Sequence, residues 1–287
     1  TVDQEATRAI QEERPLGKFN GLGTYFNRAH LASAELAEAW QTSTGLGSFL
    51  GSIMNLPFYS ALAFTLTYTF VVTPFVLVLG LAIAVGVNNL PKIFKGPTIF
   101  VSLLPMIVTP LVGALILFWM VDGDGVIGAS LQLLFNDPTL SLKATTSLNW
   151  IMLIIYGIWS SLPFSFIVFY AGLQTVPSDT MEAARIDGAS NWQRMIYVVV
   201  PHLMPLVVFI TLIQLMDNFR VFEPIVSFQA EAHATSLSWI IYNDLIAAGN
   251  PLYGSAGATS MLTIIGVAFL LMPVLIRTWR DFNRKSV

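Results

Sequence analysis

The 287-residue sequence contains no cysteine, which excludes disulfides, thiolate metal sites and cysteine nucleophiles. It also lacks the G-x-x-x-x-G-K-[ST] loop that cradles nucleotide phosphates, so nothing in the chain could hydrolyse ATP. The net charge of −3 gives no indication of nucleic-acid binding. The histidines lie far apart without the spacing of metal ligands, and we expect ordinary polar or interfacial roles for them. They are His30, His202 and His233.

Charged residues are scarce. They make up 11% of the chain, against about 25% in a typical soluble domain, and they avoid the long apolar runs. Hydrophobic residues make up 55%, and the mean hydropathy is +0.68. The composition is therefore that of an integral membrane protein. The N-terminus does not show the basic-then-apolar pattern of a signal peptide.

Five predominantly apolar runs are long enough to cross a bilayer as helices, since a span needs about 20 residues. They predict an all-α, polytopic membrane protein with transmembrane helices over 58–87, 98–121, 148–173, 197–216 and 258–276. The runs are too long and too uniform for the alternating strands of a barrel. Prolines stand in the second and fourth runs, where neighbouring helices or water can satisfy the freed carbonyls.

Lys and Arg in the short loops predict the orientation of these spans. Basic residues cluster between the first two spans, between the third and fourth, and after the fifth; they are Lys92, Lys95, Arg185, Arg194, Arg277, Arg280, Arg284 and Lys285. We therefore expect the loop at 177–195 and the C-terminus to be cytoplasmic. Residues 1–57 are then a periplasmic segment, with short helices over 3–14 and 31–40, ahead of a transmembrane domain at 58–287. A chain that starts outside without a signal peptide is expected to have a preceding sixth span.

Between the third and fourth spans lies a charged segment that predicts two short helices with a hinge. Two pairs of residues have the spacing of a capping box, Asp179 with Glu182 and Ser190 with Gln193. The first pair predicts a helix over 180–187, and the second starts a helix that leads into the fourth span. Gly188 stands where a helix end needs a left-handed residue.

This segment carries small residues between charged ones, which lets another backbone or a groove approach closely. The small residues are Ala183, Ala184, Gly188 and Ala189, and the charged residues at their rim are Glu182, Arg185 and Asp187. An amphipathic helix on lipid is an alternative, but such helices usually carry several basic residues and large apolar ones. A DNA-binding helix-turn-helix would need a basic face, which the segment lacks.

The pattern Glu-Ala-Ala-x2-Asp-Gly-Ala-x11-Pro-x3-Pro, from Glu182 to Pro205, resembles the EAA loop of permease subunits in binding-protein-dependent ABC importers. The resemblance implies a type I importer permease fold and a coupling helix that docks in a groove of a cytoplasmic ATPase subunit. It assigns that contact to Glu182, Ala183, Ala184, Asp187, Gly188 and Ala189. ATP and Mg would bind to the two ATPase subunits, and this chain would be a translocation subunit of the bacterial inner membrane and not an enzyme.

Two further stretches resemble the subfamily of sugar and glycerol-phosphate importers related to the maltose permease. Residues 21–25 are similar to a stretch that follows the first span in that group, and residues 253–256 resemble its entry to the last span. The subfamily implies import of a sugar, oligosaccharide or glycoside, a second and different permease subunit, and a periplasmic substrate-binding protein. The chain departs from the pattern at Met195 and Val200, and it lacks the Gly-Gly-Pro of the last outer loop.

A hydrophilic substrate needs polar groups at membrane depth, and polar residues in spans are functional candidates. One group, near the outer end of the fourth span, could bond sugar hydroxyls or, through its arginine, an anionic group; it comprises Gln214, Asp217, Asn218 and Arg220. A second group, near the middle of the third span, could stack on sugars and comprises Tyr156, Trp159, Ser160 and Ser161. Contact with periplasmic water and ordinary helix packing are the alternative explanations.

Other functions stay open on the sequence alone. An importer permease for a polyamine, glycerol phosphate or another non-sugar solute would share the EAA loop. A proton- or sodium-coupled secondary transporter would place a carboxylate deep in a span, and the apolar runs carry none away from their ends. A membrane scaffold that only anchors a partner would give no substrate-stimulated ATPase activity when purified with its partners.

Overall fold

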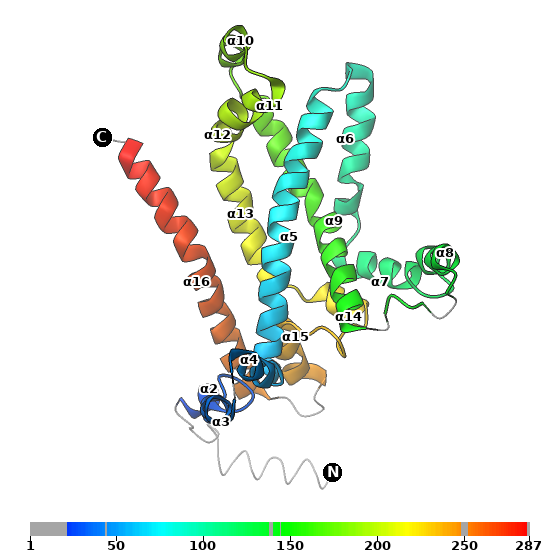
Figure 1. Ribbon diagram of the computed structural model, residues 1–287, viewed down its shortest axis with the longest axis vertical. Helices are drawn as coiled ribbons and strands as arrows, with labels where there is room; N and C mark the ends of the chain where they lie inside the picture. The colour runs from blue at the N-terminus through cyan, green and yellow to red at the C-terminus, as the bar shows by residue number, and fades with distance from the viewer. Residues whose placement is uncertain (1–21, 44, 138–139, 144, 248–251, 286–287) are drawn as a thin grey trace, which may run out of the picture.

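The computed structural model describes residues 22–43, 45–137, 140–143, 145–247 and 252–285, with side chains described as far as residue 280. Within these ranges the regular structure is entirely helical, as the sequence predicted. Long helices run along the long axis of the molecule, and short helices lie at both ends and on one side near the middle (Figure 1). The predicted helix over 3–14 lies outside the described residues.

Three described helices are long and apolar enough to cross a membrane: α5 (Pro57–Asn88), α9 (Thr146–Leu173) and α16 (Tyr253–Lys285). They cover the predicted spans at 58–87, 148–173 and 258–276, and α16 extends beyond its prediction at both ends. Pro57 begins α5 favourably, because the first turn of a helix does not use the N–H that proline lacks. The Thr145 hydroxyl caps α9 by accepting a hydrogen bond from the Leu148 N–H at 3.3 Å.

The predicted span at 98–121 is not one helix. It divides into α6 (Lys92–Ile107) and α7 (Pro110–Met120), which meet at 95°. The cause is Pro110, which donates no hydrogen bond and disfavours a helical conformation in the residue before it. Thr109 is accordingly extended, with ψ 145°, and Val108 has ψ 124°. The run predicted as the second span is therefore bent at Pro110, a break that the sequence analysis did not predict.

The predicted span at 197–216 begins earlier and is also bent. Its parts are α11 (Asn191–Arg194), the π-helical η1 (Met195–Val199), α12 (Val200–His202) and α13 (Met204–Phe219). The bend between the segments on either side of Leu203 is 68°. Pro201 and Pro205 flank the bend and cannot donate to the carbonyls one turn before them, so the helix does not continue straight. If each bent pair is one span, the described chain has up to five.

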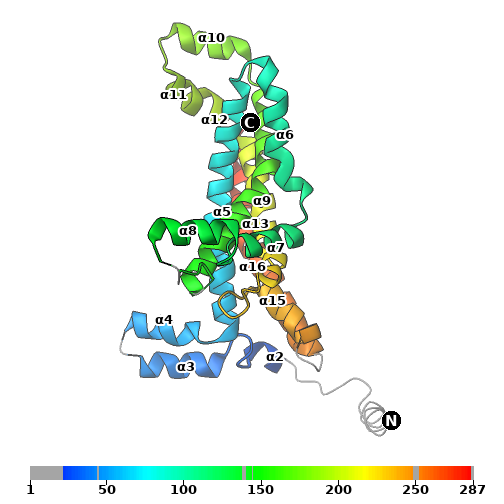
Figure 2. The same ribbon diagram turned by 90° about the vertical axis from the view of Figure 1, so that its right-hand side faces the viewer.

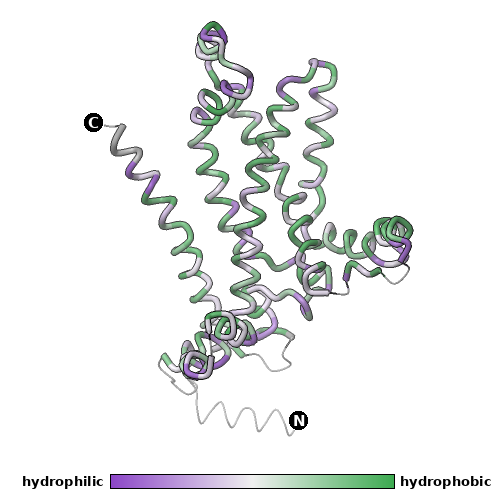
Figure 3. Tube along the Cα trace, in the orientation of Figure 1, coloured by the Kyte–Doolittle hydropathy of each residue, from purple (hydrophilic) through white to green (hydrophobic). Residues whose placement is uncertain are grey.

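Helix α5 lies at the centre of the bundle, with α9 and α13 packed against it (Figure 1). The approach of α9 is close at Gly80, where a Cβ atom would lie 2.8 Å from the Ser165 Cβ. Buried apolar side chains form one cluster around Phe64 and a second around Phe166. Figure 3 shows apolar residues along the long helices and hydrophilic residues mainly toward their ends, as a bilayer requires.

The remaining described helices are short and lie in the connections between the long ones. They are α2 (Gly23–Phe26), α3 (Ser33–Thr42), α4 (Leu46–Met54), α8 (Val126–Phe135), α10 (Ser178–Ile186), α14 (Glu223–Ser227), α15 (Leu237–Tyr242) and the π-helical η2 (Asn243–Ala247). Helix α3 overlaps the predicted helix at 31–40 but begins two residues later, and α4 was not predicted. The α5–α6 turn, α10 and the C-terminal end of α16 share one end of the molecule, opposite α3, α4 and α15 (Figures 1 and 2).

Candidate functional site: a surface loop and a polar cavity

Helix α10 begins differently from the prediction. Asp179 and Glu182 do not form a capping box, because Pro177 takes the N-cap position and the helix starts at Ser178. Asp179 is therefore already inside the first turn, where its carboxylate accepts a hydrogen bond from the Ser178 hydroxyl at 3.3 Å. An acidic side chain in the first turn still favours the helix through its macrodipole.

The end of α10 and the start of α11 follow the predictions. Gly188 has φ +81°, a left-handed conformation that a side chain disfavours. Its N–H bonds the Arg185 carbonyl at 3.1 Å, and the Ala189 N–H bonds the Ala184 carbonyl at 3.0 Å. These two bonds form a Schellman motif, which ends the helix and reverses the chain. The capping box of Ser190 and Gln193 is present, with bonds of 2.7 and 3.3 Å.

The loop is tied to the spans at three points. The Gln174 amide donates to Asn88 Oδ1 at the end of α5, at 3.1 Å. Thr175 Oγ1 lies 3.1 Å from His202 Nε2 on α12. The Met181 side chain of α10 packs against the apolar cluster around Phe166. The segment that carries α10 is therefore in contact with α5, α9 and α12.

The outer surface of the loop is exposed. Glu182, Ala183, Asp187 and Gly188 are exposed, and Ala184 and Ala189 are half-buried. Two large apolar side chains stand among them, Ile186 at 86% exposure and Trp192 at 71%. None of the charged residues of α10 forms an ion pair within the described chain. Exposed large apolar side chains are typical of a surface that binds another protein or a membrane.

A polar cavity of about 510 Å³ lies between α5, α9, the break of the second span and the end of α13. It brings together the two groups of candidate residues that the sequence kept apart. Six of the eight candidates line it: Tyr156, Ser160, Ser161, Asp217, Asn218 and Arg220. Hydroxyl, amide and aromatic groups thus surround one space. This combination of groups is suited to binding a polyhydroxyl compound.

The other two candidates lie outside this cavity. Gln214 is buried, and its Oε1 accepts a hydrogen bond from Asn218 Nδ2 at 3.4 Å. Asn218 also donates to Thr73 Oγ1 on α5 at 3.1 Å, so Gln214 and Thr73 help to hold the amide. Trp159 lines a separate apolar cavity of about 300 Å³ beside α7.

Several lining residues were not predicted. Tyr68 of α5 and Glu223 of α14 contribute side chains, and the broken second span contributes Pro105, Met106, Val108 and Pro110. The prolines in that run were the available signal, because non-helical backbone at membrane depth occurs where it lines a cavity or is buried in protein.

The charges around the cavity do not favour an anion. Arg220 forms an ion pair with Asp217 at 2.8 Å, and both side chains are more than half exposed. Glu223 is exposed and has no ion-pair partner in the described parts of the chain. The charged side chains of the lining therefore carry one net negative charge, from one arginine and two carboxylates.

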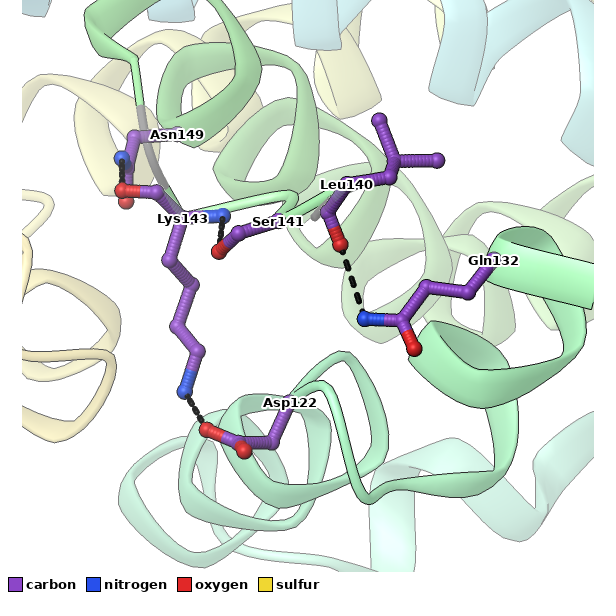
Figure 4. Close-up of polar contacts among 6 residues, drawn as sticks. All are labelled: Asp122, Gln132, Leu140, Ser141, Lys143 and Asn149. Atoms are coloured by element: carbon purple, nitrogen blue, oxygen red, sulfur yellow. Dashed lines mark hydrogen bonds and ion pairs between the residues drawn. The ribbon is translucent and has the colours of Figure 1, made fainter. Parts of the chain in front are cut away.

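A second ion pair fixes the connection between α8 and α9 (Figure 4). Lys143 binds Asp122, and its ammonium group lies 3.5 Å from the centroid of the Phe118 ring. The hydrogen bond from Lys143 and its positive charge hold the pKa of the Asp122 carboxyl below its usual range. The Asn149 amide donates to the Lys143 carbonyl at 3.0 Å, which joins this loop to the first turn of α9.

These features define a class of protein. A helical membrane subunit with broken spans around a polar cavity, an exposed loop tied to those spans and no nucleotide-binding loop is the translocation component of a multisubunit transporter. Residues 43–281 match the family described as binding-protein-dependent transport system inner membrane component, and the chain belongs to this family. The predicted type I importer permease fold is confirmed, and the chain is a translocation subunit and not an ATPase.

Individual relatives agree with this assignment. The chain is 30% identical over 231 residues to the trehalose transport system permease protein SugA of Mycobacterium tuberculosis, covering 79% of this chain and 73% of that one. It is 30% identical over 234 residues to the multiple sugar-binding transport system permease protein MsmF of Streptococcus mutans, covering 79% of each. Its fold resembles a chain of a bacterial ABC transporter that imports the acidic polysaccharide alginate, with a TM-score of 0.66, 18% identity and coverage of 97% and 98%.

Proposed function

We propose that this chain is the permease subunit of an ATP-driven importer for a neutral sugar, oligosaccharide or glycoside. It works beside a second, homologous permease subunit and two cytoplasmic ATPase subunits, which bind ATP and Mg²⁺. A periplasmic binding protein delivers the substrate. The observation that carries the proposal is the polar cavity, which unites hydroxyl, amide and tyrosine side chains from separate helices. The sugar permeases among the relatives support the same substrate class.

The charges of the cavity favour a neutral sugar over the alternatives. Glycerol phosphate or an acidic polysaccharide would need a free cation, but Arg220 is already paired with Asp217. A polyamine would need several carboxylates facing it, and Glu223 is the unpaired carboxylate of the described lining. Hydroxyl groups of a neutral sugar can bond to Ser160, Ser161 and Asn218 without bringing a further charge into the cavity.

The exposed face of α10 is the coupling surface in this proposal. Glu182, Ala183, Ala184, Asp187, Gly188 and Ala189 contact a groove of an ATPase subunit. Closure of the two ATPase subunits around ATP moves α10, and the ties at Gln174, Thr175 and Met181 pass that movement to the spans. The spans then switch between inward- and outward-facing arrangements, a change between two packed states.

This assignment sets the orientation of the chain in the bacterial inner membrane. The α10 end, with the basic α5–α6 turn and the C-terminal end of α16, is cytoplasmic, in accord with the positive-inside rule. The opposite end, with α3, α4 and α15, is periplasmic and meets the binding protein. Under this orientation the ion-paired Arg220 and Asp217 lie on the periplasmic side of the cavity.

The test is uptake by the full complex reconstituted in proteoliposomes with its binding protein. Neutral disaccharides and oligosaccharides, glycerol phosphate and a polyamine are offered in turn, and ATPase stimulation is measured with each. We expect stimulation and uptake only with neutral sugars. Stimulation by glycerol phosphate or the polyamine alone would contradict the substrate class.

A pair of matched variants tests the cavity. Ser160→Leu places an apolar side chain in the polar lining and should lower the rate of sugar uptake by at least tenfold. Ser130→Leu makes the same change on the exposed surface of α8, outside the cavity, and should leave uptake unchanged. Equal uptake by the two variants would show that the cavity is not part of the substrate path.

A further inference from the structure

A second polar cavity lies at the other end of the bundle, beneath the coupling loop. It has a volume of about 290 Å³ and is bounded by the ends of α5 and α9, by α10 and by the α11–η1 turn. Its lining comprises Val85, Asn88, Asn89, Leu173, Met181, Asn191, Arg194, Met195 and Val199. The residues come from both sides of the Gly188 hinge and from two spans, so an occupant of this cavity can contact both sides of the hinge and the spans.

The polar part of this lining offers hydrogen-bond donors and a cation. Arg194 bonds Asn191 Oδ1 through its NH2 group, but its Nε is shielded from solvent and has no hydrogen-bond partner within the described residues. Leaving such a donor unsatisfied is unfavourable, and a buried unpaired N–H of a cation calls for a ligand. Four other buried side-chain atoms are unpaired, and none of their residues lines any of these three cavities.

The asparagines reinforce this donor character. Asn191 Oδ1 accepts from Arg194, and Asn88 Oδ1 accepts from Gln174 at 3.1 Å, so their NH2 groups are left as donors. Lys95 places a further positive charge beside the cavity, where its ammonium group bonds the Asn88 carbonyl at 2.8 Å. That charge also offsets the negative end of the α5 dipole, which would otherwise repel an anion. The lining itself contains no carboxylate.

The rest of the lining is apolar and lies where the spans end. A ligand of this cavity therefore combines a small anion with an apolar part, and an anion held by a guanidinium and amide donors is typically a phosphate. In the orientation proposed above this cavity lies on the cytoplasmic side, where basic pockets between spans bind anionic lipid headgroups. We propose that this cavity is a binding site for the phosphate group of an anionic phospholipid, anchored by Arg194.

Such a ligand bridges the coupling loop and the spans. Met181 contacts it from α10 on one side of Gly188, and Arg194 from α11 on the other, while Asn88 belongs to α5. The orientation and this consequence both rest on the proposed function, in which bound lipid stiffens the connection through which α10 moves the spans. Anionic lipid then raises the coupling of ATP hydrolysis to uptake.

The test measures binding directly, by native mass spectrometry of the purified full complex in a neutral detergent. Short-chain phosphatidylglycerol is titrated, with short-chain phosphatidylcholine and inorganic phosphate as separate arms. We expect saturable binding of phosphatidylglycerol and weaker binding of phosphatidylcholine. Arg194→Gln should weaken phosphatidylglycerol binding about tenfold. Lys92→Gln removes a positive charge at the same end but outside the cavity and should leave binding unchanged.

A second variant keeps the proposal testable if Arg194→Gln does not assemble into the full complex. Asn191→Asp keeps Arg194 but gives it an internal carboxylate, which should weaken phosphatidylglycerol binding by a similar factor. The proposal is overturned if phosphatidylcholine binds equally well, or if Arg194→Gln and Asn191→Asp both bind phosphatidylglycerol like the wild type. It is also overturned as a lipid site if only inorganic phosphate binds in an Arg194-dependent way. Because the measurement needs no transport, these outcomes leave the proposed import function untouched.

Discussion

The phenolic O–H of Tyr156 on α9 donates a hydrogen bond to the main-chain oxygen of Pro110, 2.7 Å away. Pro110 is the first residue of α7, directly after the point where the second span turns by 95°. The bond therefore fixes the bend to the wall of the polar cavity that both residues line. Gly113 makes room for the ring, since a Cβ atom there would lie 2.5 Å from the Tyr156 oxygen.

Removal of this hydrogen bond should loosen the bend. We expect Tyr156→Phe to lower the free energy of unfolding by about 1 kcal/mol, because one net hydrogen bond is lost. The thermal midpoint of the purified protein, followed by intrinsic fluorescence, should fall by a few degrees, and sugar uptake should slow. Tyr170→Phe is the matched control on the same helix, since its hydroxyl makes no hydrogen bond within the described structure. Identical midpoints for the two variants would show that the Tyr156 bond does not stabilise the bend.

A methyl group at Gly113 should displace the Tyr156 ring. Gly113→Ala brings a Cβ atom within 2.5 Å of the hydroxyl and 3.1 Å of the ring, and such overpacking costs about 1–3 kcal/mol. The double variant with Tyr156→Phe should be more stable than the sum of the two single effects predicts, because the closest clash is with the hydroxyl. Gly86→Ala in α5 has no atom within 4 Å and should be neutral or slightly stabilising. Strict additivity of the two effects on stability would show that position 113 and the Tyr156 hydroxyl do not interact.

The sequence was sufficient where the structure depends on local patterns. Apolar runs at 58–87 and 148–173 predicted α5 and α9, and the Gly188 turn with the Ser190–Gln193 box followed from capping chemistry alone. The Asp179–Glu182 capping box was wrong because Pro177 takes the N-cap position, and the bends at the prolines of the second and fourth spans were not predicted. A proline in a membrane helix either is tolerated or breaks the helix, and the outcome at Pro110 depends on the neighbouring α9, which local sequence does not reveal.

The polar cavity could be predicted only in parts. The α9 and α13 residues were recognised as polar groups in apolar runs, but nothing in the sequence shows that α9 and the end of α13 face one space. Glu223, the first residue of α14, was missed because the sequence places it in the connection after the fourth predicted span, where a carboxylate is ordinary. Gln214 was included, although its side chain is buried and bonds Asn218. Tertiary packing decides which face of a helix is turned toward a cavity, and the hydrophobic periodicity of the sequence alone does not.

The Asp122–Lys143 ion pair predicts a pH effect on stability. Because the folded-state pKa of Asp122 is depressed, the pair contributes stability above the unfolded pKa of about 3.9, and this is lost as pH falls through the lower folded value. We expect the thermal midpoint of the wild type to fall between about pH 5 and pH 3 more steeply than that of Lys143→Gln. Asp124→Asn should keep the wild-type slope, since Asp124 forms no ion pair in the described structure. The same slope in Lys143→Gln would assign the acid effect to other groups.

The left-handed turn at Gly188 predicts how coupling fails. A leucine at φ +81° costs about 1–2 kcal/mol and adds bulk to the exposed face of the loop, whereas asparagine tolerates this conformation. We expect Gly188→Leu to reach the membrane in normal amounts but to lose uptake and substrate-stimulated ATPase activity in the full complex. Gly188→Asn should retain most of both, because the Schellman bonds of Gly188 and Ala189 survive. Normal uptake by the leucine variant would remove the coupling role from this turn, and equal loss in both variants would place the defect in side-chain bulk at the ATPase contact.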